Sequence, residues 1–330
     1  MTDTAENHLQ KMMSCDTFHT KSMNTEQQAR GESMNMNKYL ILDTDIGNDI
    51  DDHWALAMML RTPGMEPDLI VTASGDTPYR AAVTRHFLKN AGFSHIPVAA
   101  GELRKDQDIP ETLRHILSEE ELDRQEVCDG VERMIAMIEK ADSVTIVAIG
   151  ALTNIAQIAQ RRPDLTKKCR IVAMSGSYDG SFMDKPGRIP EFNVYSDCAA
   201  AKIVYSTQWQ DLLLTPLDHC GALVMDGADY QKVFTAKNPV AKELIATYHD
   251  WTAWLSEEDK KSKSSILFDT AAVKLATPGG EESSVIREMR IAIADDGSWV
   301  EDDSAPVCRV ALAWKDRAAY ISELAAILGD

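Results

Sequence analysis

The sequence lacks several features that would place it in other classes of protein. No run of 18 apolar residues is present, so no transmembrane helix is predicted and no membrane partner is expected. The N-terminus has no basic stretch followed by an apolar one, which argues against a signal peptide. Positive charge is scarce, because 34 lysines and arginines stand against 52 aspartates and glutamates, for a formal net charge of −18. Such a surface repels phosphate backbones, so a small neutral substrate is favoured over a nucleic-acid polymer.

Cysteines at metal-binding spacing are also missing. Six cysteines are scattered along the chain, and none of them belongs to a CxxC arrangement. Dispersed thiols in a chain of 330 residues are typical of reduced, mostly buried side chains in a reducing compartment. The cysteines therefore indicate neither a zinc site nor a disulfide framework, and we expect a cytoplasmic protein.

What the sequence has in excess is aspartate within one short segment. Residues 43–52 read DTDIGNDIDD, with five aspartates in ten positions, and they follow the apolar run 39–42. Crowded carboxylates repel one another unless a cation lies among them. A strand ending near Asp43, a turn at Gly47 and a helix starting near Asp51 would aim several oxygens at one point. An oxygen-only ligand set suits Ca2+ or Mg2+. A solvated acidic turn that caps the helix is the structural alternative.

The rest of the chain alternates between short β-rich runs and amphipathic segments. Residues 1–37 are polar and show no periodicity, so we expect a disordered extension before a single domain at 38–330. The predicted strands are 39–44, 68–74, 96–99, 143–149, 170–174 and 211–216. The predicted helices are 52–61, 78–91, 129–140, 152–161 and 197–205. This alternation predicts an α/β fold with a mostly parallel, twisted central sheet flanked by helices, in a Rossmann-like open arrangement.

The C-terminal third is less regular. The elements predicted there are a helix around 238–255, strands at 287–293 and 307–314, and a closing helix at 316–328. The charged stretch 257–265 lacks apolar anchors, so it is interpreted either as a mobile lid or as a plain solvated loop. Ligands of open parallel sheets bind outside the carboxyl ends of the strands. Polar residues gather after the first, second and fourth predicted strands, which places the expected site at that edge.

An ordered set of motifs runs through the chain. The first is the aspartate segment 43–52. The further motifs, in order, are Gly75-Asp76, 96–101 (IPVAAG), 150–154 (GALTN), 174–176 (MSG), 190–193 (PEFN), Asp197 and Phe268-Asp269. Over about residues 38–330 the chain thereby resembles one known family, the calcium-dependent nucleoside hydrolases of the inosine–uridine-preferring type. The resemblance implies a nucleoside-hydrolase-like fold, a small-molecule nucleoside as substrate, and a homodimer or homotetramer.

The resemblance also implies a Ca2+ site and a general base. The implied cation ligands are Asp45, Asp52, Asp269 and the backbone carbonyl of Ile149. Asp51 would be the base that takes a proton from a water on the cation, and Asp43 would orient the ligands from behind. This chain has two more residues than the family's common spacing between the glycine and the paired aspartates, so Asp49 is a second candidate for the base.

Substrate contacts follow from the same resemblance. Glu191 and Asn193 would hydrogen-bond ribose hydroxyls, and Asp76 would do so from the other side. Cleavage of an N-glycosidic bond passes through an oxocarbenium-like state, in which the sugar gains positive charge. Carboxylates around the ring stabilise that charge, and a cation that acidifies a water lets a nearby carboxylate complete the deprotonation.

The chain departs from the family where the base would leave. Phe268 stands where many members have a histidine that helps to protonate a purine leaving group. His53, His219 or His249 could replace that acid, although a structural role is as compatible with each of them. Trp251 could stack on the nucleobase. The missing acid favours pyrimidine nucleosides, or another N-riboside whose leaving group needs no proton.

The leading hypothesis is a divergent, Ca2+-dependent N-ribohydrolase of purine or pyrimidine ribonucleosides, a glycosidase that releases ribose and a free base. A non-catalytic protein that binds ribose or a nucleoside on the same fold is one alternative. A hydrolase of another N-riboside is a second. Release of ribose from a panel of nucleosides separates the enzymes from the binding protein.

Overall fold

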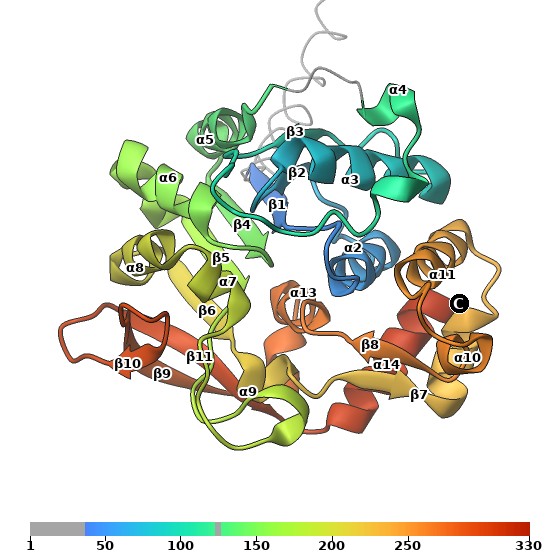
Figure 1. Cartoon of the computed structure of the whole chain (residues 1–330). Coiled ribbons are helices and arrows are strands. Elements are labelled where there is room, and N and C mark those ends of the chain that lie inside the picture. The colour runs from blue at the N-terminus through green and yellow to red at the C-terminus, as the bar shows by residue number, and fades with distance from the viewer. Residues whose placement is uncertain (1–36, 123–126) are drawn as a thin grey trace, which may run out of the picture. The chain divides into compact units, whose positions relative to one another are not determined.

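A mostly parallel sheet forms the centre of the part of the chain that this computed structural model describes, residues 37–122 and 127–330. The extension expected at 1–37 lies outside the described residues, except for Asn37. The strand order is β10-β9-β11-β6-β5-β4-β1-β2-β3 (Figure 1). The seven neighbouring strands β3-β2-β1-β4-β5-β6-β11 are paired in parallel. Strand β9 is antiparallel to both of its neighbours, β11 and β10. The predicted fold class is therefore confirmed.

The strands and helices agree closely with the predicted segments in the first two thirds of the domain. The strands of the main sheet are β1 (Lys38–Thr44), β2 (Leu69–Thr72), β3 (Val98–Ala100), β4 (Ser143–Ala148), β5 (Cys169–Met174), β6 (Asp211–Thr215), β9 (Ser284–Ile293), β10 (Trp299–Glu301) and β11 (Val307–Trp314). The longer helices between the parallel strands are α2 (Asp51–Arg61), α3 (Thr77–Ala91), α5 (Gly130–Lys140), α6 (Thr153–Arg161) and α8 (Cys198–Ser206). Their bounds lie within two residues of the prediction, because hydrophobic periodicity changes clearly at each junction.

Two apolar cores lie on the two faces of this sheet. Successive strand residues point to opposite faces, so Ile41 belongs to one core and its neighbour Leu42 to the other. Helices α5, α6 and α8 cover one face, and α2 and α13 (Thr270–Ala276) cover the other (Figure 1). Burial on both faces explains why the strands read as continuous apolar runs.

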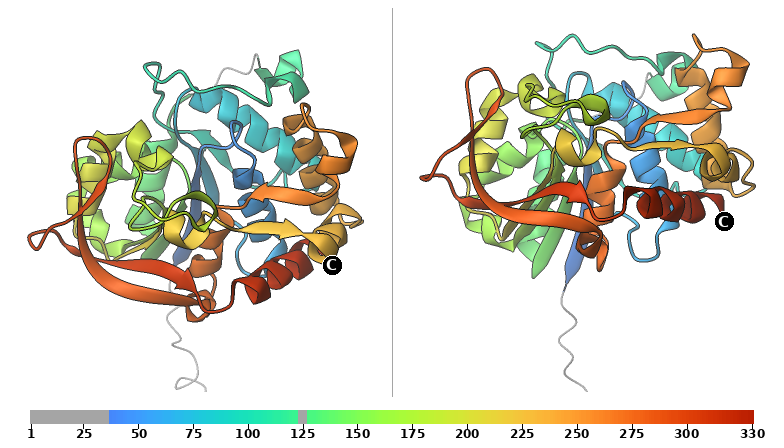
Figure 2. Two further views of the ribbon diagram at one scale, coloured as in Figure 1. Left: turned by 60° about the horizontal axis from the view of Figure 1, so that its bottom comes forward. Right: turned by 90° about the horizontal axis from the view of Figure 1, so that it is seen from below.

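The C-terminal third contains elements that the sequence pattern did not predict. The segment 257–265 is neither a plain loop nor without anchors, because it forms α12 (Glu257–Lys260) and most of β8 (Lys263–Ile266), which pairs with β7 (Val224–Asp226). Helix α11 (Pro239–Trp251) ends four residues before the predicted end, and α14 (Arg317–Gly329) closes the chain. Further short elements are α4 (Glu119–Leu122), α7 (Phe192–Ser196), α9 (Leu217–Cys220) and α10 (Gly227–Phe234). Figure 2 shows β9 and β10 curving away at one edge of the sheet.

The described residues contain no helix that is long and apolar enough to cross a membrane. They also contain no disulfide. Cys169, Cys220 and Cys308 are buried, and each of these thiols hydrogen-bonds to a backbone carbonyl.

Candidate active site

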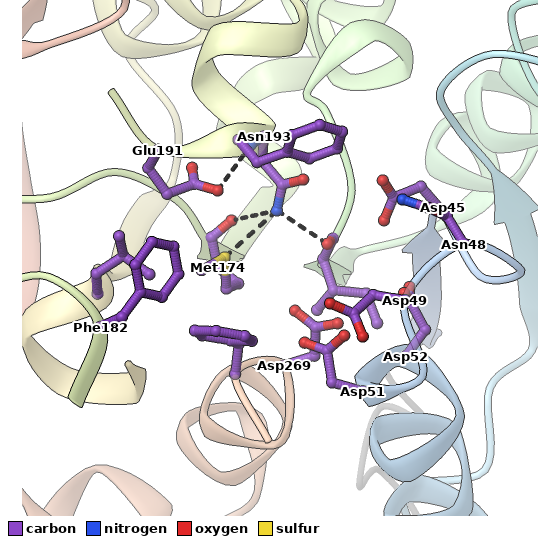
Figure 3. A pocket seen from close by; sticks show the side chains of 14 residues that line it. Asp45, Asn48, Asp49, Asp51, Asp52, Met174, Phe182, Glu191, Asn193 and Asp269 are labelled. Atoms are coloured by element: carbon purple, nitrogen blue, oxygen red, sulfur yellow. Dashed lines mark hydrogen bonds between the residues drawn. The ribbon is translucent and has the colours of Figure 1, made fainter. Parts of the chain in front are cut away.

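A cavity of about 280 Å³ lies at the carboxyl ends of the central strands (Figure 3). Its lining comes from the segments that follow β1, β4, β5 and β6 and from the start of α13. The lining residues are Asp45, Asn48, Asp49, Asp51, Asp52, Ile149, Met174, Phe182, Glu191, Phe192, Asn193, Leu217, Phe268 and Asp269. The cavity therefore lies at the edge where ligands of open parallel sheets bind.

The aspartate loop, residues 45–52, follows β1 and enters α2. It turns at Gly47, whose φ of +108° favours glycine, and brings Asp51 and Asp52 into the first turn of α2. The free N–H groups and the dipole of a helix N-terminus favour negative charge at this position. The hydroxyl of Thr44 also donates a hydrogen bond to the Asp52 carboxylate.

The segment after β4 passes close to the aspartate loop. A Cβ on Gly150 would lie 2.9 Å from the backbone nitrogen of Asp45, which is too short for any residue with a side chain. Glycine at this position therefore lets Ile149 and the aspartate loop line the same cavity.

Three carboxylates form a candidate cation site. Ligand oxygens of Asp51, Asp52 and Asp269 all lie within 4.8 Å of one another, and all three residues are buried. Asp269 reaches the cluster from far along the chain because it occupies the N-cap position of α13. Asp45 and Asp49 line the cavity but lie outside this group of three. The structure thus groups Asp51 with Asp52 and Asp269, whereas the resemblance implied that Asp45 is the third aspartate ligand.

Burial and mutual repulsion act on these carboxyl groups. The pKa of Asp51 is raised well above its usual value by burial and then by the charge of Asp49. The pKa values of Asp52 and Asp269 are raised in the same way, by burial first and by the neighbouring aspartates second. A divalent cation in the cluster would oppose both effects, so the donor set fits a hard cation.

Arg80, in helix α3, is a positive side chain that opposes the negative charge of the aspartates, and no motif in the sequence pointed to it. Its guanidinium is buried and donates hydrogen bonds to the backbone carbonyls of Ser74, Asp45 and Ile46. The pKa of Asp45 is raised by burial and lowered in part by Arg80. Arg80 therefore holds the backbone of the aspartate loop and leaves its carboxylates available.

Asp43 lies behind the loop and does not line the cavity. Its Oδ2 accepts a hydrogen bond from the amide of Asn154 at 2.7 Å, and its backbone carbonyl accepts one from the N–H of Ile149. Burial raises the pKa of Asp43 to about 7. This position connects the strand end of β1 to the segment after β4.

Glu191 and Asn193 lie on the cavity wall next to the aspartates (Figure 3). As the N-cap of α7, Glu191 accepts hydrogen bonds at its carboxylate from the backbone N–H groups of Asn193 and Val194, and it accepts another from the N–H of Gly176 after β5. Burial still raises its pKa to about 7. The Asn193 amide donates to the carbonyl of Ile149 at 3.0 Å, so one lone pair of that carbonyl is already used.

Asp76 is not brought into the cavity. It is the N-cap of α3, and its side chain accepts a hydrogen bond from the N–H of Tyr79 at 2.9 Å. The sequence is consistent with this capping role, because an N-cap aspartate followed by a proline in the first turn is a common helix start. Its ribose contact stays a prediction.

Three phenylalanines belong to the lining of the cavity, and Phe182 lies across it from Asp51 and Asp52 in Figure 3. The rings of Phe182 and Phe268 meet edge to face with centroids 5.8 Å apart, and Phe192 also lines the cavity. The sequence pattern did not identify Phe182 or Phe192 as site residues.

The histidines considered as acids lie outside the described lining. His53 is fully buried against Phe87, and burial lowers its pKa to about 3. His219 bonds to the hydroxyls of Thr215 and Ser284, and burial lowers its pKa to about 3 as well. His249 packs against Phe234, away from the cavity lining. A structural role is thus favoured for all three.

Trp251 supports the aspartate loop from outside the cavity. Its indole N–H donates to the backbone carbonyl of Asn48 at 2.8 Å. The Thr112 hydroxyl donates to the same carbonyl at 2.6 Å, and the Tyr79 hydroxyl donates to the carbonyl of Gly47 at 2.8 Å. These three donors were missed as a group, because they come from separate parts of the chain.

Comparison with known proteins agrees with this site. Residues 40–320 match the family model described as inosine-uridine preferring nucleoside hydrolase. A pyrimidine-specific ribonucleoside hydrolase, RihA, from Enterobacter sp. (strain 638) is 29% identical over 65% of this chain and 73% of its own length. A non-specific ribonucleoside hydrolase, RihC, from Klebsiella pneumoniae (strain 342) is 27% identical over 79% of this chain and 85% of its own.

Solved structures show the same fold at lower identity. A plant nucleoside hydrolase superposes with a TM-score of 0.72 at 22% identity, over 89% of this chain and 99% of that one. An inosine–guanosine nucleoside hydrolase superposes with a TM-score of 0.70 at 19% identity, over 88% of this chain and 98% of the other.

Proposed function

Because the chain belongs to the inosine–uridine preferring nucleoside hydrolase family and is a ribonucleoside N-ribohydrolase, we propose that it works with Ca2+ and a carboxylate base. The observation that carries this proposal is the buried group Asp51, Asp52 and Asp269 inside the cavity. The donors are all carboxylate oxygens, the ligands that Ca2+ prefers. The family membership favours an enzyme over a non-catalytic binding protein.

The residues that line the cavity have different proposed roles in the reaction. A cation in the cluster would supply Lewis acidity toward a water. A carboxylate of the aspartate loop accepts the proton of the attacking water, and the aspartates stabilise positive charge that develops on the ribose. Glu191 and Asn193 line the wall beside them and are proposed to hold ribose hydroxyls. Pyrimidine nucleosides are the expected neutral substrates, because no histidine that could protonate a purine base lines the described cavity.

Two assignments of the base remain, and they predict different behaviour. In the first, Asp45 binds the cation and Asp51 is the base. In the second, Asp51 binds the cation with Asp52 and Asp269, and Asp49 is the base. The structure supports the second grouping of ligands through the short distances within that cluster.

The test measures Ca2+ affinity and ribose release on the same variants. We expect Asp52→Asn and Asp269→Asn to weaken calorimetric Ca2+ binding and to abolish release of ribose from uridine. A base variant keeps the Ca2+ affinity and loses about 10²- to 10⁴-fold in kcat. Comparison of Asp45→Asn, Asp49→Asn and Asp51→Asn then identifies the base. Full activity after chelation, or in Asp52→Asn, would contradict the proposal. The cytoplasmic location and the homo-oligomeric state stay predictions.

A further inference from the structure

We propose that this site hydrolyses cationic N-ribosides, in which ribose is joined to a positively charged ring nitrogen of the pyridinium type, in preference to neutral nucleosides. The inference rests on the proposed function and specifies its substrate class. Three features of the cavity support it: the sign of its charge, the aromatic wall, and the chemistry of the leaving group.

The cavity is strongly acidic. Five aspartates and Glu191 line it, and its described lining contains no lysine, arginine or histidine. Arg80 adds one positive charge from behind Asp45, and a bound divalent cation would add two more. The six carboxyl groups of the lining outnumber these three positive charges. The negative charge of such a cavity attracts a cationic substrate, whereas it does not strengthen the binding of a neutral nucleoside.

The aromatic wall of the cavity, formed by Phe182, Phe268 and Phe192, suits a cationic ring. Phe182 and Phe268 meet edge to face at 5.8 Å, and Phe192 completes the aromatic part of the lining. Aromatic faces carry a negative quadrupole that attracts cations and stacks on flat heterocycles. Phe182 faces the aspartates across the cavity, so a riboside with its sugar near the carboxylates would extend its ring toward Phe182 (Figure 3).

The position of Phe182 is fixed by its own segment. Asp218 accepts hydrogen bonds from three consecutive backbone N–H groups, those of Tyr178, Asp179 and Gly180, at 2.6–2.7 Å. The N–H of Met183, next to Phe182, bonds to the carbonyl of Gly221 at 2.8 Å. The backbone of the Phe182 segment is therefore anchored both before and after Phe182, although the Phe182 side chain is 46% exposed.

The leaving group supplies the third argument. When the C1′–N bond of a neutral nucleoside breaks, the electron pair goes to a ring nitrogen that must then be neutralised by a proton. The histidines that could give this proton lie outside the cavity lining, and His53 and His219 are buried. A cationic riboside needs no acid, because the same electron pair neutralises its ring nitrogen.

The atoms of the proposed reaction balance with water as the sole co-reactant. The water oxygen bonds to C1′, the C1′–N bond breaks, and the heterocycle departs as a neutral molecule with the bonding pair. One proton of the water passes to the aspartate base and then to solvent. The products are ribose, the neutral heterocycle and one proton.

The test compares nicotinamide riboside with uridine on the intact protein in the presence of Ca2+. We expect kcat/KM to be at least tenfold higher for nicotinamide riboside. We also expect its kcat/KM to fall as ionic strength rises from 20 to 300 mM, because salt screens attraction between the cavity and a cation, while the value for uridine changes little.

A variant separates the aromatic wall from the leaving-group effect. Phe182→Leu keeps an apolar side chain and removes the ring, so the ratio of kcat/KM for nicotinamide riboside to that for uridine should fall at least fivefold. Phe93→Leu is the matched control, because Phe93 lies outside the cavity lining, and the ratio should not change.

The outcomes distinguish this inference from the proposed function. Ribose release from uridine with equal or lower kcat/KM for nicotinamide riboside overturns the cationic preference and leaves the proposed function standing. An unchanged ratio in Phe182→Leu overturns the role of the aromatic wall. No Ca2+-dependent release from either substrate overturns the proposed function itself.

Discussion

At the scale of single residues, the pattern of aspartates in the sequence predicted where the site lies, but it did not determine the role of each aspartate. Asp45, Asp49, Asp51, Asp52 and Asp269 line one cavity, as expected for carboxylates after a strand of a parallel sheet. The sequence could not show which of them lie within 4.8 Å of one another, because that depends on the path of the loop through Gly47.

The histidines show a second limit of sequence reasoning. The pKa of a histidine in a folded chain depends on burial and partners, neither of which is visible in a sequence. His219 follows a strand, as a catalytic group would, yet its ring stacks on Trp314 and both its nitrogens bond to hydroxyls. The packing of His219 therefore favours a structural role, although its position after a strand had suggested a catalytic one.

Trp251→Phe tests whether the indole N–H positions the aspartate loop. The change removes one donor to the Asn48 carbonyl and keeps the ring, so we expect about 1 kcal/mol loss of stability. Because Thr112 alone would then hold that carbonyl, kcat/KM for ribose release should fall about tenfold. Steady-state kinetics and thermal unfolding measure the two effects.

Trp254→Phe is the control for this prediction. Trp254 packs against Trp251 with centroids 5.1 Å apart, and its side chain is 67% exposed. Its replacement should leave kcat/KM within about twofold of the parent. An equal loss in both variants would show that the aromatic cluster matters, and not the hydrogen bond to Asn48.

At the scale of elements, the parallel strands and their helices were predictable because period and length change at each junction. The strands β7 and β10 have three residues each, which is too short for a period to appear, and they exist through pairing with β8 and β9. The segment 257–265, which the sequence predicted to be a lid or a loop, contains elements that are also short. Its strand β8 is fixed by a partner some 40 residues earlier in the chain.

Asp218→Asn tests the segment that carries Phe182. An amide has a single acceptor oxygen, so it cannot accept all three of the N–H groups that the Asp218 carboxylate now binds at its two oxygens. We expect the segment 177–190 to loosen, with KM raised about three- to tenfold and faster proteolytic cleavage within it. Steady-state kinetics and limited proteolysis measure these changes.

Asp179→Asn provides the matched control in the same segment. Its carboxylate is 79% exposed and lies 3.9 Å from the Arg188 guanidinium, at the far limit of an ion pair. Such an exposed pair contributes little, so KM and the cleavage rate should stay at the parent values. A parental KM in Asp218→Asn would rule out this anchoring role.

At the scale of the whole molecule, the sheet order was the part that sequence reasoning left open. Alternation of strands and helices implies parallel pairing but not which strands are neighbours. The order β3-β2-β1-β4-β5-β6 places β1 at the point where the direction of winding reverses. Ligands bind at such a point, which explains why the aspartate loop after β1 lies at the centre of the cavity.

Concentrating buried carboxyl groups at this point should make stability depend on pH and on cations. Burial raises the pKa of Glu191 from about 4.5 to about 7, and the pKa values of Asp51, Asp52 and Asp269 are raised as well. At pH values between the pKa of a group in the unfolded state and its raised pKa in the folded state, the folded state binds more protons than the unfolded state. Stability from these groups is therefore present at low pH and lost as pH rises, by roughly 3 kcal/mol for Glu191 alone.

We expect the Tm of the cation-free protein to fall by several degrees between pH 5 and pH 8, and saturating Ca2+ to restore it at pH 8. At pH 5 the same Ca2+ should stabilise less, because protons compete for the carboxylates. Thermal unfolding by circular dichroism, with and without Ca2+, measures both trends. Glu191→Gln removes one raised carboxyl group, so its cation-free Tm should depend less on pH than that of the parent. A cation-free Tm that rises from pH 5 to pH 8 would mean that these carboxylates are stabilised by the protein alone, and the case for a cation among them would fail.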